Sequence, residues 1–233
     1  MSVGRWTSTS AGRPARWAGV AVAAVTLLTS CTTPAAATFD PQRTDVRLAR
    51  SQARVEVTSA LYLVAGSRST TASAWMDRCD PGRAGLQNND PWSRRCSYEH
   101  SVALTVADMA TAQELVESGL EAARCESPMT LSDQLDSWDQ ANPGEPAPGD
   151  EDFQPGVVAP ALTDCAGGQL WIRLTSPTDP HLDRTLSAAA STTSPMVVSA
   201  HPYDSDATEE LRGTEDPVIV VFSLNRPYHE EPR

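Results

Sequence analysis

The sequence predicts an α+β domain with a mainly antiparallel sheet, helices packed on one face of that sheet, and two disulfides. Segments with a helical period and segments with strand alternation follow each other along the chain, and successive strands suggest hairpins. Four cysteines follow residue 31, an even number that suits two bridges. The predicted domain, 43–226, is long enough for one core and contains no internal repeat.

The first predicted element is a helix over residues 45–65. Its apolar residues recur at offsets of 7, 4, 4 and 3: Val46, Ala53, Val57, Leu61 and Val64. Gly66 follows the last of them and is a typical helix end. The segment is therefore expected to pack one apolar face on the sheet.

Two strands are predicted next, over 70–78 and 97–106, and they form a hairpin. The second alternates, with Tyr98, His100, Val102, Leu104 and Val106 on one face and small or polar residues on the other. One face of this strand is therefore expected to be buried.

A second helix is predicted to begin at Thr111 and to end near Arg124. Thr111 and Glu114 have the spacing of a capping box, in which each side chain satisfies a free backbone N–H. The segment carries an apolar stripe that consists of Met109, Ala112, Val116, Leu120 and Ala123.

The last third of the chain predicts three strands, over 169–175, 196–201 and 218–225, with a short helix over 181–190. Residues 218–222 are apolar on both faces, so this strand is the best candidate for the centre of the sheet.

Four cysteines remain after Cys31: Cys79, Cys96, Cys125 and Cys165. No Cys-x-x-Cys pair occurs, which argues against a zinc-ribbon or thioredoxin-type site. Three connectivities are possible. We favour 79–96 and 125–165, since each closes one turn-rich insertion and the loops are worth roughly 3 and 4 kcal/mol in the chain-entropy model.

Composition excludes several functions. The chain carries a formal net charge of -12, which argues against nucleic acid as a partner. All 18 basic residues are Arg, so a P-loop lysine or a Schiff base on Lys is excluded. Leu, Ile, Val and Phe make up 41 of 233 residues, below the ~20% typical of globular chains. Local disorder is therefore expected in the acidic Pro/Gly-rich loop at 139–156 and in the tail at 227–233.

The first thirty residues have the order of a secretory signal. Arg5, Arg13 and Arg16 precede a twelve-residue apolar stretch, 17–28, which is shorter than the ~20 residues of a membrane-spanning helix. The next residues, Leu28-Thr29-Ser30-Cys31, resemble the lipobox of bacterial lipoprotein precursors. The Arg- and Ala-rich, Lys-free composition makes the actinobacterial type the nearest resemblance.

The resemblance implies that residues 1–30 are a signal peptide and that Cys31 carries a diacylglyceryl group. The protein is then anchored by its acyl chains, palmitate among them, to the extracytoplasmic face of the cell membrane, with residues 31–42 as a flexible tether. Two alternatives are a permanent signal anchor and cleavage after the A-x-A sequence at 35–37, which would release the protein. Without residues 1–30 the charge becomes -15, since three Arg and no acid are lost.

Candidate catalytic residues are few. His201 ends a predicted strand, and Asp204 and Asp206 could orient its imidazole, although turn formation explains the same residues. His100 is expected to be a core or edge histidine, and the His229-Glu230-Glu231 sequence a frayed tail. The acids Asp133, Asp136, Asp139, Asp150, Glu151 and Asp152 lack the spacing of an EF-hand and predict a solvated loop. No catalytic, metal or cofactor motif is present.

The retained tryptophans are Trp75, Trp92, Trp138 and Trp171. An indole can form a platform for a sugar or a partner, and Trp92, beside Pro91 in the predicted 80–95 loop, is the first candidate. Trp171 is expected on the second face of its strand. We therefore expect a non-enzymatic binding or sensing module for an envelope protein or a small ligand. The alternatives are an envelope-acting hydrolase that uses His201 and nearby acids, and a structural spacer.

Overall fold

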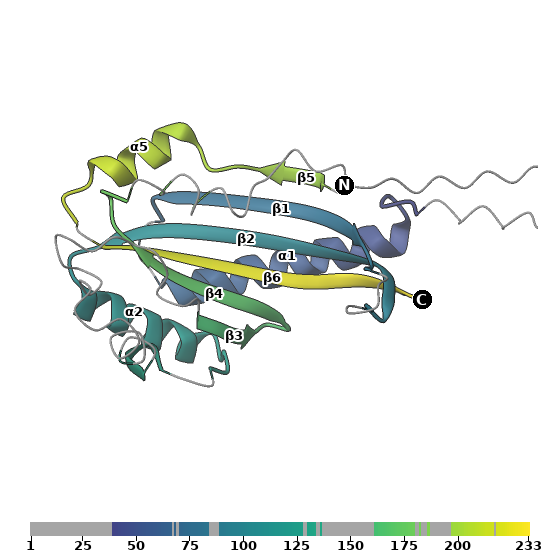
Figure 1. The fold of residues 1–233 in the computed structure, drawn as a ribbon, viewed down its shortest axis with the longest axis horizontal. Helices are drawn as coiled ribbons and strands as arrows, with labels where there is room; N and C mark the ends of the chain where they lie inside the picture. The colour runs from purple at the N-terminus through teal and green to yellow at the C-terminus, as the bar shows by residue number, and fades with distance from the viewer. Residues whose placement is uncertain are drawn as a thin grey trace, which may run out of the picture. The chain divides into compact units, whose positions relative to one another are not determined.

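Two long strands, β2 (Trp92–Val106) and β6 (Val218–Pro232), pair at the centre of a six-stranded sheet with the order β3-β4-β6-β2-β1-β5 (Figure 1). The other strands are β1 (Ala72–Pro81), β3 (Ala161–Cys165), β4 (Gly168–Thr175) and β5 (Val197–His201). Each neighbouring pair is antiparallel. The predicted α+β class with a mainly antiparallel sheet is confirmed, and so is the central position of 218–222.

The computed structural model describes residues 39–66, 68, 70–83, 89–127, 130–133, 136, 161–179, 182, 186, 197–216 and 218–233. Residues Asp40–Arg233 belong to one compact unit. The expected signal peptide, most of the tether, the loop at 139–156 and most of the short helix at 181–190 lie outside the described residues. Among the described helices, none combines the length and the apolar character needed to cross a membrane.

Two helices, α1 (Thr44–Ala65) and α2 (Met109–Ala122), cover one face of the sheet, which we call the inner face. The five apolar residues that predict α1 are all buried: Val46, Ala53, Val57, Leu61 and Val64. Gly66 adopts a φ of 68° at the helix end, a conformation that favours glycine. Phe222 of β6 is fully buried in this core, and the predicted buried face of β2 lies here as well.

The opposite face, which we call the outer face, is apolar over only part of its area. A smaller core there contains Ala103, Ile219 and Val221 of the sheet together with Leu211 of α5 (Ser205–Gly213). Ala72 of β1, Leu182 and Leu186 complete it. The rest of the outer face is polar, as described in the next section.

Both preferred disulfides are confirmed: Cys79 pairs with Cys96, and Cys125 with Cys165. Cys79 and Cys96 are directly opposite each other on β1 and β2. The second bridge joins the chain after α2 to the last residue of β3.

The cap of α2 corrects a prediction. The helix begins at Met109, two residues before Thr111, and the N-cap is Asp108, whose carboxylate accepts a 2.7 Å hydrogen bond from the Thr111 backbone N–H. Thr111 is therefore the third residue after the cap. The backbone N–H at this position commonly donates a hydrogen bond to the side chain of the N-cap residue.

The C-terminus also differs from the expectation. Residues 227–232, predicted as a disordered tail, continue β6 and pair with β2 as far as the Trp92–Pro232 pair. The backbone N–H and C=O groups of this segment form hydrogen bonds with β2. These bonds keep the polar segment in the sheet although it buries little apolar surface. Two elements were not predicted at all, β3 and α5.

Candidate functional site: a groove on the outer face

A groove of about 1250 Å³ lies on the polar part of the outer face. Its floor consists of residues from β2, β4 and β6. The rest of the lining comes from β1, from the connection between β1 and β2, from Asp164 of β3 and from Gly167 in the β3–β4 turn. The residues that matter chemically are Arg78, Trp92, Glu99, Gln169, Trp171, Arg173 and Asn225.

Strand alternation places these side chains on the outer face. On β2, Tyr98 belongs to the inner core, so its neighbours Ser97 and Glu99 point outward. On β6, Leu224 belongs to the inner core, and Ser223 and Asn225 line the groove. The outer face is thus polar at this end, although the same strands are apolar on both faces further along.

Three polar side chains form a row across the floor of the groove. Gln169 of β4 is opposite Asn225 of β6, and Asn225 is opposite Glu99 of β2. The amide Nδ2 of Asn225 donates a 3.3 Å hydrogen bond to Oε2 of Glu99. We call these three residues the polar row.

The next register of the sheet continues the polar surface. Trp171 of β4 is opposite Ser223 of β6, which is opposite Ser101 of β2, and the Ser101 hydroxyl donates a 2.7 Å hydrogen bond to that of Ser223. Trp171 is half-buried and lines the groove. It lies on the second face of its strand, as predicted.

The carboxyl group of Glu99 has an unusual electrostatic environment. Burial raises its pKa, while the charges of Arg78 and Arg173 and the hydrogen bond from Asn225 act in the opposite direction. Burial also raises the pKa of Tyr203, which packs beside the apolar part of the outer face. A proton on Glu99 therefore costs less than on a solvated carboxylate.

The arginines of the groove differ in their partners. Arg78 Nε lies 3.1 Å from Asp80, and Arg95 Nε lies 3.1 Å from Glu230. Arg173 has no acidic oxygen within 4.0 Å among the residues that the structure describes. The same holds for the guanidinium of Arg83, but Arg83 is exposed beyond the end of β1, whereas Arg173 is half-buried on β4, two residues from Trp171. Arg173 is thus an available guanidinium on the strands of the groove floor.

Trp92 also lines the groove, but it is the first residue of β2 and not part of a loop as expected. The guanidinium carbon of Arg95 lies 5.9 Å from the centre of its ring. Trp75, in contrast, is packed against the inner core, and Trp138 lies outside the described residues. Two of the four tryptophans therefore share this surface.

His201 is exposed at the end of β5, and its ring lies 6.3 Å from that of Trp75 on the neighbouring strand β1. Asp204 serves as the N-cap of α5, where its carboxylate accepts a hydrogen bond from the Asp206 backbone. Within the described part of the chain, His201 has no acidic hydrogen-bond partner. Its placement offers the hydrolase alternative no acid–histidine pair.

His100 faces α1, as expected for a histidine of the inner face. Its Nε2 lies 3.1 Å from the Ser73 hydroxyl and its Nδ1 lies 3.5 Å from that of Thr58. Burial lowers the pKa of His100 to about 4, and the charge of Arg54 acts in the same direction. The ring is therefore neutral at physiological pH.

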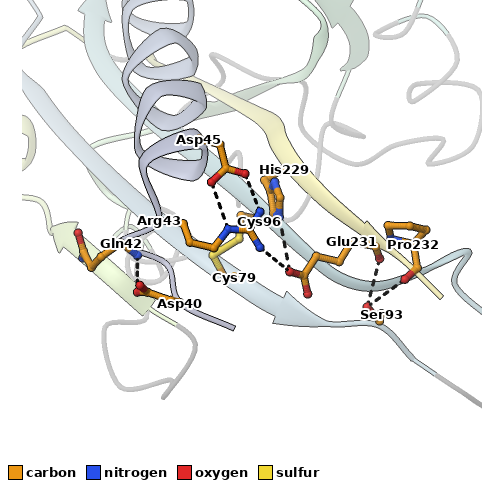
Figure 2. A network of polar contacts seen from close by, with 10 residues as sticks. All are labelled: Asp40, Gln42, Arg43, Asp45, Cys79, Ser93, Cys96, His229, Glu231 and Pro232. Carbon is orange, nitrogen blue, oxygen red and sulfur yellow. Dashed lines mark hydrogen bonds and ion pairs between the residues drawn. A yellow bond between two sulfur atoms is a disulfide. The ribbon is translucent and has the colours of Figure 1, made fainter. Parts of the chain in front are cut away.

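The C-terminal His229-Glu230-Glu231 sequence has a structural role (Figure 2). Glu231 lies 3.5 Å from Arg43, and Arg43 in turn forms a 2.6 Å ion pair with Asp45 in the first turn of α1. His229 Nε2 lies 3.9 Å from the same Glu231 carboxylate. These contacts connect the start of α1 to the end of β6.

No cluster of three or more metal-ligating side chains occurs among the described residues. Asp133 accepts hydrogen bonds from the backbone and hydroxyl of Thr130. Of the other predicted loop acids, Asp136 is exposed, and Asp139, Asp150, Glu151 and Asp152 lie outside the described residues.

Sequence reasoning missed the polar row entirely. Glu99 could be assigned to the polar face of a strand, but Gln169 and Asn225 belong to strands that are remote in sequence. A glutamate, an amide and a tryptophan on alternate positions of three strands are a weak signal without the strand order.

Comparisons with protein-family models, with curated proteins and with solved structures found no match for this chain.

Proposed function

We propose that the protein is a lipoprotein, held through Cys31 at the extracytoplasmic face of the cell membrane, that binds a polar ligand in the groove on its outer face. The anchor and the binding site are separate parts of this proposal. Each is supported by its own residues and has its own test.

The sequence before residue 32 supports the anchor. Basic residues, a twelve-residue apolar stretch and Leu28-Thr29-Ser30-Cys31 follow one another in the order of a lipoprotein precursor. Two acyl chains give stable attachment where one does not. An acidic domain of charge -15 has little electrostatic attraction to anionic head groups, so the acyl chains supply the attachment.

The groove is the single observation that supports binding. A large concave surface that combines aromatic faces with converging polar groups is typical of a ligand site. Trp92 and Trp171 supply the aromatic faces, and the polar row supplies donors and acceptors. Nothing in a sheet of this kind requires a half-buried indole on a polar face, whereas a bound ligand explains it.

The anchor is tested by expressing the full-length chain in a bacterial host. Wild-type protein is expected in the membrane fraction, with the mass of a diacylglyceryl group on a chain that begins at Cys31. Cys31→Ala is expected to abolish the lipid mass and the attachment. A wild-type protein cleaved after Ala37, or a Cys31→Ala variant that stays membrane-bound, would contradict the anchor.

The binding site is tested by thermal unfolding of the detergent-solubilised protein against a library of envelope saccharides, peptides and small metabolites. A ligand at about 100 times its Kd is expected to raise Tm by about 5 °C or more. Trp171→Ala is expected to abolish this rise, whereas Tyr62→Ala, an exposed aromatic residue on α1, should retain it. Binding that survives Trp171→Ala unchanged would place the site elsewhere.

A further inference from the structure

We propose that the ligand of the groove is a carbohydrate that carries a carboxylate, with its ring on Trp171, its hydroxyls on the polar row and its carboxylate on Arg173. This inference rests on the proposed binding function and names the chemical class that the groove selects. It follows from three features of the groove: an aromatic face, a row of mixed donors and acceptors, and an available guanidinium.

The aromatic face suits a sugar ring. A pyranose presents a patch of C–H groups on one face and hydroxyls around its edge, so it pairs with a flat aromatic ring bordered by polar groups. Trp171 has this setting, because it lies on β4 one register from the polar row. Trp92 lines the same groove and can contact a further ring of an oligosaccharide.

The polar row suits hydroxyl groups better than it suits other polar groups. Gln169 and Asn225 each present a donor and an acceptor, and Glu99 adds two more oxygen atoms. These side chains lie on neighbouring strands, and the strands are about 4.8 Å apart. A hydroxyl can donate and accept at once, so a polyhydroxylated ligand can satisfy such a row, whereas an aliphatic ligand would leave its buried polar groups unpaired.

Arg173 is the feature of the groove that indicates a negative charge on the ligand. The groove is lined by four Arg, Arg78, Arg83, Arg95 and Arg173, and by four acids, in a protein whose formal net charge is -12. The charged side chains of the lining therefore balance each other formally, although the whole chain is acidic. Arg78 and Arg95 already have acidic partners at 3.1 Å, and Arg83 is exposed beyond the end of β1. Arg173 is half-buried on β4 beside Trp171, so it is the arginine best placed to engage a ligand carboxylate through two parallel hydrogen bonds.

Glu99 selects a carboxylate over a more highly charged group. A phosphate dianion bound to Arg173 would face the Glu99 carboxyl, and the two would repel each other if both were charged. Burial raises the pKa of Glu99, which shows that added negative charge is disfavoured at this carboxyl, and a single negative charge on the ligand repels it less than two would. The site thus fits a monoanion with hydroxyls on either side of it.

The experiment compares acidic saccharides with their own methyl esters by isothermal titration calorimetry on the full chain in detergent. The probes are tetragalacturonate, a hyaluronan tetrasaccharide and N-acetylglucosaminyl-N-acetylmuramate. Each ester retains the rings and linkages, but a neutral methyl ester replaces each carboxylate. At least one acid is expected to bind about ten times more tightly than its ester, since charge-assisted hydrogen bonds are about twice as strong as neutral ones.

Two variants assign the contacts. Arg173→Gln is expected to remove the preference for the acid and to leave the affinity for the ester unchanged. Trp171→Ala is expected to weaken both about tenfold or more. Arg68→Gln removes an exposed guanidinium outside the groove and serves as the matched control, with no expected effect on either ligand.

The outcomes separate this inference from the proposed function. If no acidic saccharide binds, or if each ester binds as tightly as its acid, the ligand class is overturned. A peptide or neutral sugar whose binding is lost in Trp171→Ala would then still support the groove as a binding site. If Arg173→Gln retains the acid preference, the carboxylate lies elsewhere and the assignment of Arg173 is wrong.

Discussion

His100 lies near the middle of β2, with its ring between the sheet and α1. Its pKa in the fold is about 4, below the ~6.5 of an unfolded chain. The neutral ring therefore contributes stability that is complete above about pH 6.5 and is lost as the pH falls towards 4. We expect His100→Gln to reduce the loss of unfolding free energy between about pH 7.5 and pH 4.5 by about 2 kcal/mol, as measured by urea unfolding.

His201→Gln is the matched control, because this ring is exposed at the end of β5 and lies 6.3 Å from that of Trp75. The control should follow the wild-type pH dependence. Equal pH dependence in wild type and His100→Gln would show that the His100 ring is solvated in the folded state.

Asp77 is the most buried acid of the inner face, with 1% of its surface exposed. It accepts a 2.6 Å hydrogen bond from the Tyr228 hydroxyl and lies 2.5 Å from Arg50 of α1. Removing one partner of a buried pair leaves the other charge uncompensated, so Asp77→Asn is expected to lower the free energy of unfolding by about 3 kcal/mol.

The comparison for Asp77 is Asp45→Asn, which breaks an exposed ion pair with Arg43. Solvent screens that pair, so its loss should leave urea unfolding unchanged within error. Similar destabilisation by the two substitutions would contradict a special role for the Arg50–Asp77–Tyr228 network.

At the scale of elements, the sequence predicted best those helices and strands whose hydrophobic period extends over many residues. The helical period of α1 and the alternation of β2 extend over many residues, and their buried faces agree with the prediction. The short β3 has no comparable period. The start of α5 uses Asp204, Ser205 and Asp206, which are turn formers and helix caps alike, so local chemistry could not separate the two.

The pairing of the polar end of β6 and the polar row were both missed by sequence reasoning for another reason. The pairing of 227–232 with β2, and the meeting of Glu99 with Asn225 across a separation of 126 residues, depend on which strands are neighbours. Strand order arises from packing of the whole chain, and one sequence contains little local information about it.

Gly119 of α2 lies at a close approach between the two inner helices. A Cβ added there would lie 2.2 Å from the backbone oxygen of Val64 in α1, so the helices would have to separate. Alanine is the better helix former by about 1 kcal/mol, yet we expect Gly119→Ala to lower the free energy of unfolding by about 2 kcal/mol. Denaturant unfolding measures the change.

Gly213, the last residue of α5, provides the opposite case. A Cβ there meets nothing within 4 Å, so Gly213→Ala should be neutral or slightly stabilising. A stabilising effect of Gly119→Ala would show that α1 and α2 are further apart than in this structure.

At the scale of the whole molecule, a small share of aliphatic residues supports two cores, one on each face of a single sheet. The inner core is covered by α1 and α2, whereas the outer core covers only part of its face and leaves the groove uncovered by it. A domain that leaves part of its central sheet polar buries less apolar surface, so it depends more on covalent cross-links.

The two disulfides should therefore contribute a large part of the stability. The bridges span 17 and 40 residues, and the chain-entropy model gives about 3 and about 4 kcal/mol for loops of these lengths. We expect the Cys125→Ala/Cys165→Ala double variant to lose more unfolding free energy than Cys79→Ala/Cys96→Ala in urea. Loss of both bridges would remove about 7 kcal/mol, comparable with the whole 5–15 kcal/mol of an ordinary domain, so the four-alanine chain should be largely unfolded at about 37 °C. A four-alanine variant with the wild-type Tm would show that the sheet and its two cores are sufficient without the cross-links.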